Sequence, residues 1–151
     1  MPDPEYRQAT PKDAAAIAAV GVAVWDELGA NSGLPQRPTR DGVEQLVASY
    51  GERGAMFVYD NAGEVSGFAA LTPDENDPEE AVMGVWLLRA ARRKGVGREL
   101  ALMATDFARA AGYQKLRGPL PEGNEPALSF FSDIGSLAQV VGQGMEYELP
   151  L

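Results

Sequence analysis

The sequence predicts a mixed α/β fold, and three observations lead to this prediction. The chain of 151 residues is 45% apolar and 23% charged, which is typical of a folded globular protein. Segments of strand-type composition alternate with segments in which apolar residues recur at helical spacing. One nearly continuous apolar run, residues 81–88, has the pattern of a strand buried on both faces. Because this length is close to that of one ordinary domain, residues 1–151 are expected to form a single domain.

The first part of the chain predicts one strand and two helices. Residues 5–9 resemble a short strand, and Thr10 then provides the N-cap of a helix that runs to about Leu28. The loop 29–38, rich in Gly, Pro and Asn, ends this helix. Thr39 caps a second, shorter helix, which two glycines end.

The middle of the chain predicts a hairpin followed by a strand, a loop and a helix. Residues 55–60 and 65–72 are rich in β-branched and aromatic side chains and flank a short turn. The apolar run 81–88 then leads through a basic loop that contains glycines into a helix over residues 99–111. We therefore expect a buried strand that leads directly into an amphipathic helix.

The last part of the chain predicts one strand, one helix and a closing hairpin. Residues 113–117 have strand character, and a short helix over 125–134 begins near Asn124. Residues 137–141 and 145–149 flank a glycine-rich turn. The order of elements is therefore that of one mixed α/β domain.

Cysteine and histidine are both absent from the sequence. Their absence excludes disulfides, thiolate nucleophiles, Ser-His-Asp triads, and zinc sites built from Cys or His. No metal site is predicted. Catalysis is left to carboxylates, hydroxyl groups, amines, backbone amides, water or an imported cofactor.

Charge and hydropathy narrow the range of partners. The net charge of −9 and the isoelectric point near 4.5 disfavour nucleic acids and anionic membranes. No apolar run approaches the roughly 20 residues that cross a bilayer. The N-terminus is acidic where a secretory signal would be basic. A cytoplasmic protein is therefore expected.

A basic loop is the local exception to this acidic composition. Residues 89–98 hold five of the 13 Lys and Arg residues, which leaves eight against 22 Asp and Glu elsewhere, a net charge of −14. The five are Arg89, Arg92, Arg93, Lys94 and Arg98. A glycine-containing loop between a buried strand and a helix favours phosphate. It is not a P-loop, because Arg98 and Glu99 follow Gly97, and Leu100 excludes the dinucleotide fingerprint.

Two spaced sequence patterns, one in this loop and one further along the chain, indicate a more specific function for the loop. Arg92, Gly95 and Gly97 fit the pattern Gln/Arg-x-x-Gly-x-Gly/Ala. A second pattern, Asn-x-x-Ala-x-x-Phe-Tyr-x-x-x-Gly-Phe, is met in part by Asn124, Ala127, Phe130, Phe131, Gly135 and Ser136. With these patterns and its order of elements, nearly the whole chain resembles the GNAT superfamily of N-acetyltransferases, in which the first pattern is the acyl-coenzyme A signature.

The resemblance implies a fold and a coenzyme site. The fold is a mixed, mostly antiparallel sheet of about six to seven strands, with helices on both faces and splayed central strands. The pantetheine of acetyl-coenzyme A lies in the splay beside the fourth strand. Its implied contacts are Leu87, Leu88 and Arg89, with Asn124 near the acyl end. The implied coenzyme-binding loop is Arg92, Arg93, Lys94, Gly95, Val96, Gly97 and Arg98, in which the amides of residues 93–98 hold the pyrophosphate. The alternatives are core packing for the leucine side chains and a solvated helix start for the arginines.

The position of the usual catalytic acid departs from the family pattern. A tyrosine that protonates the departing thiolate is common there, but this chain has Phe131, which has no proton to give. Ser129, Ser132, Tyr113 or water remain as donors, since a thiolate with a pKa near 8.5 is a tolerable leaving group.

A carboxylate is expected to deprotonate the acceptor amine. Glu79 and Glu80 lie at the start of the buried strand, where many members of the family carry such a base. Strand alternation places Glu79 on the side of Leu87, although a bulge would exchange the two glutamates. An exposed charge pair at the strand entry is the favoured alternative.

The acceptor site is expected around the first helix and the following loop, with Trp25, Asp26 and Glu27 as candidates. Core packing is an equally good interpretation of Trp25. The predicted function is transfer of an acetyl group from acetyl-coenzyme A to a small-molecule or peptide amine by direct attack in a ternary complex. A homodimer is compatible with the sequence. The alternatives are a non-catalytic acyl-coenzyme A sensor and, less favoured by the charge, a nucleic-acid-binding protein.

Overall fold

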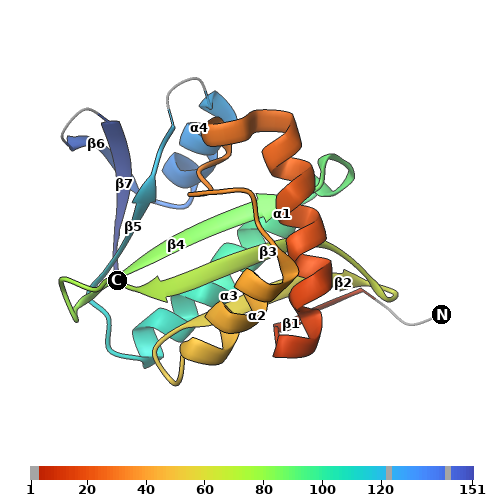
Figure 1. The fold of residues 1–151 in the computed structure, drawn as a ribbon. Coiled ribbons are helices and arrows are strands. Elements are labelled where there is room, and N and C mark those ends of the chain that lie inside the picture. Colours follow the sequence, from red (N-terminus) through yellow and green to blue (C-terminus); the bar gives the residue numbers. More distant parts are fainter. Residues whose placement is uncertain (1–3, 122–123, 142–143) are drawn as a thin grey trace.

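Residues 4–121, 124–141 and 144–151 are described in the computed structural model of the protein (Figure 1). The strands are β1 (Glu5–Gln8), β2 (Ala55–Asn61), β3 (Glu64–Pro73), β4 (Glu80–Leu87), β5 (Lys115–Pro119), β6 (Leu137–Val141) and β7 (Gly144–Pro150). The helices are α1 (Ala14–Leu28), α2 (Arg40–Ser49), α3 (Val96–Ala110) and α4 (Glu125–Asp133), with short 3₁₀ turns η1 (Pro11–Asp13), η2 (Gly29–Ser32) and η3 (Arg89–Ala91).

The strands of the described residues form one seven-stranded sheet in the order β1-β2-β3-β4-β5-β7-β6. Neighbours pair antiparallel except for β4 and β5, which run parallel. A parallel pair needs a crossover connection, and α3 supplies it between these two strands. The predicted mixed, mostly antiparallel sheet is confirmed.

The parallel pair is short, and this creates the central feature of the fold. β4 and β5 pair only at Glu80↔Lys115, Ala81↔Leu116 and Val82↔Arg117. Beyond these positions β4 continues against β3 as far as Leu87, whereas β5 continues against β7. We call the region between residues 83–87 of β4 and residues 118–119 of β5 the β4–β5 splay. The expected splayed central strands are therefore present.

Two apolar cores cover the two faces of the sheet. On one face, α1 and α2 pack over Val58, Phe68 and neighbouring side chains. On the other face, α3 and α4 pack over Met83, Leu116 and neighbouring side chains. Figure 1 shows α1 and α2 in front of the sheet and α3 behind it. Helices on both faces were expected from the sequence and are confirmed.

The helix boundaries follow local capping. Thr39 caps α2 as predicted, since its hydroxyl accepts a hydrogen bond from the Gly42 amide at 3.0 Å. The expected start of α3 at residue 99 is wrong, because the helix begins at Val96. Gly95 has a left-handed φ of +81°, which turns the chain into the helix one residue before Val96.

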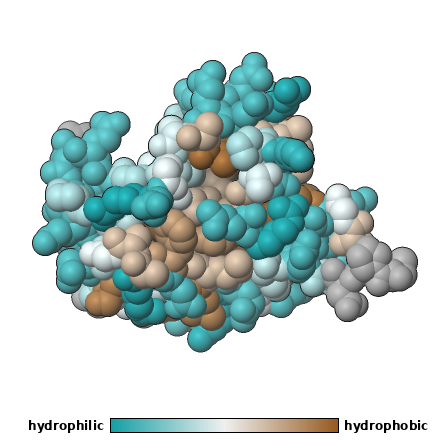
Figure 2. All heavy atoms as spheres, turned by 90° about the horizontal axis from the view of Figure 1, so that it is seen from below, coloured by the Kyte–Doolittle hydropathy of each residue, from teal (hydrophilic) through white to brown (hydrophobic). Residues whose placement is uncertain are grey.

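The face on the underside of the molecule is mostly hydrophilic (Figure 2). Figure 2 shows the molecule from below Figure 1, with hydrophilic side chains around most of the rim and apolar ones gathered mainly in the middle. No helix in the described ranges is long and apolar enough to span a membrane.

Candidate active site

The loop between β4 and α3 has the geometry of an anion site. Two of its residues, Arg93 with φ +63° and Gly95 with φ +81°, are left-handed. For arginine this conformation is uncommon, and such strain often accompanies a functional loop. The first backbone bond of α3 runs from the Glu99 amide to the Gly95 carbonyl at 3.1 Å. The amides of the preceding turn have no acceptor within the helix and point toward its N-terminus, which favours an anion there.

Gly97 lies where this loop meets two other elements. A Cβ built on Gly97 would lie 3.2 Å from Phe130 Cε2 and 3.3 Å from Leu87 Cδ1. The glycine therefore allows α4 and the end of β4 to approach α3 closely. A larger residue here would disturb packing as well as any ligand, so substitution of Gly97 does not test binding alone.

The backbone of β4 offers hydrogen-bonding groups to the splay at alternate residues. The Leu88 amide donates to the Ser66 carbonyl of β3 at 2.8 Å. In an antiparallel strand, the N–H and C=O groups of successive residues point alternately to the two neighbouring strands. Because Leu88 bonds to β3, the backbone groups of Val85 and Leu87 point to the other side, toward the splay. The backbone amide of Leu88 is thus engaged with β3. Val85, which was not among the sequence candidates, lies on the same edge of β4 as Leu87.

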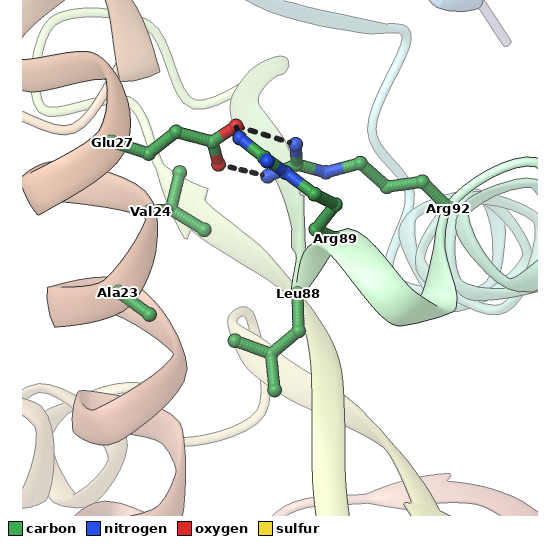
Figure 3. Close-up of a pocket in the computed structure, with 6 residues that line it drawn as sticks. All are labelled: Ala23, Val24, Glu27, Leu88, Arg89 and Arg92. Atoms are coloured by element: carbon green, nitrogen blue, oxygen red, sulfur yellow. Dashed lines mark hydrogen bonds and ion pairs between the residues drawn. The ribbon is translucent and has the colours of Figure 1, made fainter.

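Glu27 of α1 joins this loop through two arginines (Figure 3). Its carboxylate accepts hydrogen bonds from Arg92 at 2.7 and 3.0 Å and from Arg89 at 2.9 Å. Arg92 also donates to the Leu87 carbonyl, from Nη2 at 3.0 Å and Nε at 3.2 Å. Hydrogen bonds from Arg92 and then Arg89 lower the pKa of Glu27 to about 2, and Glu27 raises the pKa of Arg92. Glu27 is therefore ionised at neutral pH.

The same residues line a hollow of about 280 Å³ between α1 and the end of β4. The lining residues are Ala23, Val24, Glu27, Leu88, Arg89 and Arg92. Figure 3 shows the guanidinium groups meeting the Glu27 carboxylate across the top of this hollow. A predicted acceptor residue and two predicted coenzyme residues thus form one ion cluster.

Phe131 is part of the core behind the splay. Its ring stacks on that of Tyr147, with centroids 3.9 Å apart and planes 9° apart, and meets Phe130 edge-on at 5.0 Å. Of the alternative donors, Tyr113 donates its hydroxyl to the Arg53 carbonyl at 2.7 Å, beyond the C-terminal end of α3. Ser129 and Ser132 are exposed.

The match to known proteins agrees with this geometry. Residues 22–135 match the Acetyltransferase (GNAT) family. The chain belongs to the GNAT acetyltransferase family. It is 34% identical over 136 residues to the uncharacterized N-acetyltransferase YjgM of Escherichia coli K12, covering 87% of this chain and 81% of that protein.

Solved structures share the fold of this GNAT protein at lower identity. The putative acetyltransferase yncA of Salmonella typhimurium, solved with acetyl-CoA, has a TM-score of 0.84 at 19% identity, covering 99% of this chain and 95% of that one. The PaiA N-acetyltransferase of Thermoplasma acidophilum, solved with coenzyme A, has a TM-score of 0.83 at 16% identity, covering 99% and 100%. Both structural matches cover almost the whole of this chain.

The turn η2 after α1 contacts both β4 and the start of α4 in this GNAT protein. The Trp86 indole of β4 donates to the Ser32 carbonyl at 2.8 Å. Asn124 donates from Nδ2 to the Asn31 carbonyl at 2.7 Å, while its Oδ1 caps α4 by accepting from the Ala127 amide at 3.2 Å. Asn124 therefore ties the start of α4 to the turn η2.

The other two acceptor candidates on α1 have different surroundings. Asp26 is exposed and pairs with Arg37 at 3.3 Å. Trp25 is half-buried, one residue before this ion pair. Both follow Val24, which lines the hollow.

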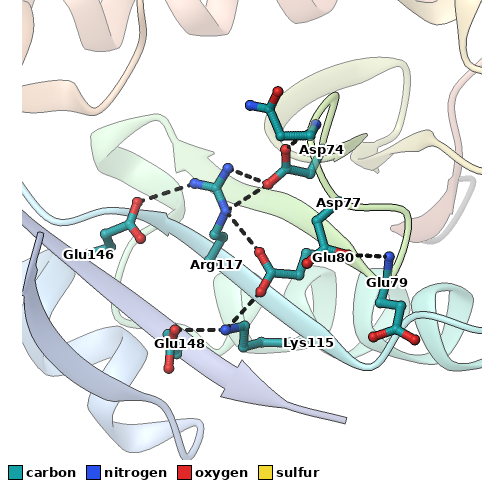
Figure 4. Close-up of polar contacts among 9 residues, drawn as sticks. Asp74, Asp77, Glu79, Glu80, Lys115, Arg117, Glu146 and Glu148 are labelled. Atoms are coloured by element: carbon teal, nitrogen blue, oxygen red, sulfur yellow. Dashed lines mark hydrogen bonds and ion pairs between the residues drawn. The ribbon is translucent and has the colours of Figure 1, made fainter.

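The predicted base region lies at the closed end of the β4–β5 pair (Figure 4). The Glu80 carboxylate pairs with Lys115 at 2.8 Å and with Arg117 at 3.4 Å. The side chain of Glu79 is exposed, and its amide donates to the Asp77 carboxylate at 2.9 Å. Of the two glutamates, Glu79 is thus the one whose carboxylate reaches solvent.

A wider ion network surrounds Glu80. Arg117 also pairs with Asp74 and with Glu146 at 3.2 Å, and Lys115 pairs with Glu148 at 2.8 Å. The Asn76 amide and Arg117 lower the pKa of Asp74, while Glu148 and Glu80 raise that of Lys115. No group of three or more acidic side chains in the described ranges is arranged to hold a metal ion.

Proposed function

We propose that this GNAT family member transfers an acetyl group from acetyl-coenzyme A to the amine of a small molecule or peptide. The observation that carries the proposal is the β4–β5 splay, which has a helix N-terminus at its wide end. Val85 directs its backbone groups into the splay, and Leu87 directs its amide there while its carbonyl is bonded to Arg92. An extended amide chain such as pantetheine pairs with such groups as a strand does.

The coenzyme would lie with its pyrophosphate at the loop Arg93–Arg98. The first amides of α3, the dipole of the helix and the basic side chains all favour two linked phosphates there. Arg92 would contribute positive charge beside the phosphates without extending toward them, because its guanidinium is bound to Glu27 and to the Leu87 carbonyl. Its role is then to fix the end of β4 rather than to reach far into solvent.

The acceptor amine has to be neutral when it attacks the thioester carbonyl. For an alkyl amine with a pKa near 10.4, deprotonation at pH 7 costs about 4.6 kcal/mol. Of the two candidate bases, Glu79 has the exposed carboxylate, whereas Glu80 is paired with two cations. Because Glu79 precedes the paired stretch of β4 and β5, it would act on the amine through water. As the C–N bond forms and the C–S bond breaks, the thiolate would take its proton from solvent, since Phe131 cannot supply one.

A non-catalytic acyl-coenzyme A sensor is the second candidate. The observation that favours it is that position 131 holds a buried phenylalanine, which has no proton to donate. Such a protein would keep the splay and bind the coenzyme without turnover.

Thiol release separates these two functions. The protein is incubated with acetyl-coenzyme A and a panel of amines that includes polyamines, amino acids and peptides, and free coenzyme A thiol is measured. Amine-dependent thiol release with acetylated product supports the enzyme. A ligand-induced rise in melting temperature without turnover on any amine supports the sensor, and no rise at millimolar acetyl-coenzyme A contradicts both.

A further inference from the structure

The narrow end of the splay is closed by a side chain from a third strand. Tyr147 of β7 lies opposite Gly118 of β5 in the sheet. A Cβ built on Gly118 would stand 2.6 Å from Tyr147 Cε1 and 2.8 Å from the carbonyl oxygen of Met83. The tyrosine ring therefore passes over β5 at Gly118, where any side chain would block it, and it points toward β4.

The Tyr147 hydroxyl ends at the first residue of the splay. It donates a hydrogen bond to the Met83 carbonyl of β4. The last paired position of β4 and β5 is Val82↔Arg117, immediately before Met83. This bond between β7 and β4 thus occupies the place where the next hydrogen bond between β4 and β5 would form.

Aromatic packing holds the tyrosine in place. Phe131 of α4 stacks on its ring, and Tyr147 is completely buried at 0% exposure. Burial raises the pKa of the Tyr147 hydroxyl. Because its hydroxyl already donates to the Met83 carbonyl and its ring is fully buried, this side chain fills space and does not supply a proton to a thiolate.

This inference rests on the proposed function. We propose that Tyr147, admitted by Gly118 and braced by Phe131, forms the floor of the acyl pocket and restricts the protein to short acyl groups of acetyl size. A coenzyme that enters from the α3 end directs its acyl group along β4 toward Met83. A long acyl chain would have to separate the hydroxyl from the Met83 carbonyl and leave both groups buried without partners.

The test is the dependence of coenzyme affinity on acyl chain length. Dissociation constants for acetyl-, butyryl- and octanoyl-coenzyme A are measured by calorimetry on wild type, Tyr147→Phe and Tyr147→Leu. Wild type is expected to bind octanoyl-coenzyme A about tenfold more weakly than acetyl-coenzyme A. Tyr147→Leu is expected to remove most of this difference, and Tyr147→Phe part of it.

Tyr113 provides a matched control in the same core. It is also buried, and its hydroxyl also donates to a backbone carbonyl, that of Arg53 at 2.7 Å. Tyr113→Phe and Tyr147→Phe should lower the melting temperature by similar amounts, because each removes one buried hydrogen bond. Only Tyr147→Phe should change the ratio of the octanoyl to the acetyl dissociation constant, which a purely structural role would leave unchanged.

Two results would overturn the proposal, and they differ from failure of the proposed function. Equal affinity of wild type for acetyl- and octanoyl-coenzyme A contradicts a floor at Tyr147. An unchanged ratio in folded Tyr147→Phe contradicts it as well, even where Tyr147→Leu does not fold. If wild type bound no acyl-coenzyme A at all, the proposed function would fail and the proposal would fall with it.

Discussion

The two ends of β4 carry ion clusters of opposite balance. Beyond Leu87, the arginines outnumber their acidic partner, since Arg89 and Arg92 share Glu27 and further basic residues follow. At the start of β4, the carboxylates are in excess, since Asp74, Glu80, Glu146 and Glu148 surround Lys115 and Arg117. The comparison shows that basic side chains are in excess at the C-terminal end of β4 and acidic ones at its N-terminal end.

This difference has a structural consequence. The basic end has cations to spare for an anionic ligand and lies where β4 and β5 have separated. The acidic end lies where the strands still pair, and there Lys115 bridges two carboxylates and Arg117 bridges three. One end is thus suited to binding and the other to holding the sheet together, and the two can be perturbed separately.

Loss of Arg117 should give the largest effect, on stability. Arg117→Met leaves Asp74, Glu80 and Glu146 without their shared cation at a partly buried position, which should cost about 2 kcal/mol of unfolding free energy. Urea denaturation measures this cost. The control is Arg40→Met, which breaks an exposed pair with Glu44 at 3.8 Å and should cost less than about 0.5 kcal/mol. Equal costs in the two variants would mean that the acidic end does not hold the sheet together.

Addition of a hydroxyl at position 131 should raise the rate of acyl transfer. Phe131→Tyr is expected to raise acyl transfer about tenfold at nearly unchanged coenzyme affinity, a part of what general acid catalysis supplies. Steady-state kinetics on an amine that wild type accepts measure the change. The matched control, Phe57→Tyr, adds a hydroxyl at another buried position of the same core and should leave the rate unchanged. If Phe131→Tyr gives no increase although wild type is already fast, proton donation is not the missing step.

Removal of the Glu27 charge should change stability in acid. Because the pKa of Glu27 is lowered to about 2 in the folded protein, its ionisation stabilises the fold above its ordinary pKa near 4.5. This contribution is lost as the pH falls from about 4.5 to about 2. After allowance for solvent screening it is about 1 kcal/mol.

Urea midpoints across this pH range test the Glu27 prediction. The loss of stability should be smaller by about this amount in Glu27→Gln than in wild type. In Glu44→Gln, which removes an exposed carboxylate of α2, the loss should match wild type. Identical pH profiles of wild type and Glu27→Gln would contradict the link between α1 and the loop.

Much of the fold was predictable from local patterns. The apolar run of β4, the glycines of the following loop and the caps at Thr39 and Asn124 are all short-range signals, and each element they predict is present. The family assignment from the two spaced patterns is confirmed. The start of α3 was missed because residues 96–98 were attributed to the loop, although a helix readily begins directly after a left-handed glycine.

The details of the site depend on contacts between distant parts of the chain. The bonds of Glu27 to Arg89 and Arg92 join residues 62 and 65 positions apart. The bond of Tyr147 to Met83 joins residues 64 positions apart through a notch at Gly118. No spacing rule predicts such contacts. Val85 was within reach of sequence analysis, because strand alternation from Leu87 places it on the same edge of β4.

The central claim is that the N-terminal end of α3 binds the phosphates of acetyl-coenzyme A, and two arginines of that helix test it most directly. Arg98 lies in the first turn of α3 and Arg109 in its last turn, and both are exposed. Calorimetric titration with acetyl-coenzyme A should show about fivefold weaker binding for Arg98→Ala, equal to about 1 kcal/mol, and unchanged binding for Arg109→Ala. Unchanged binding in Arg98→Ala, or equal weakening in both variants, would contradict the claim.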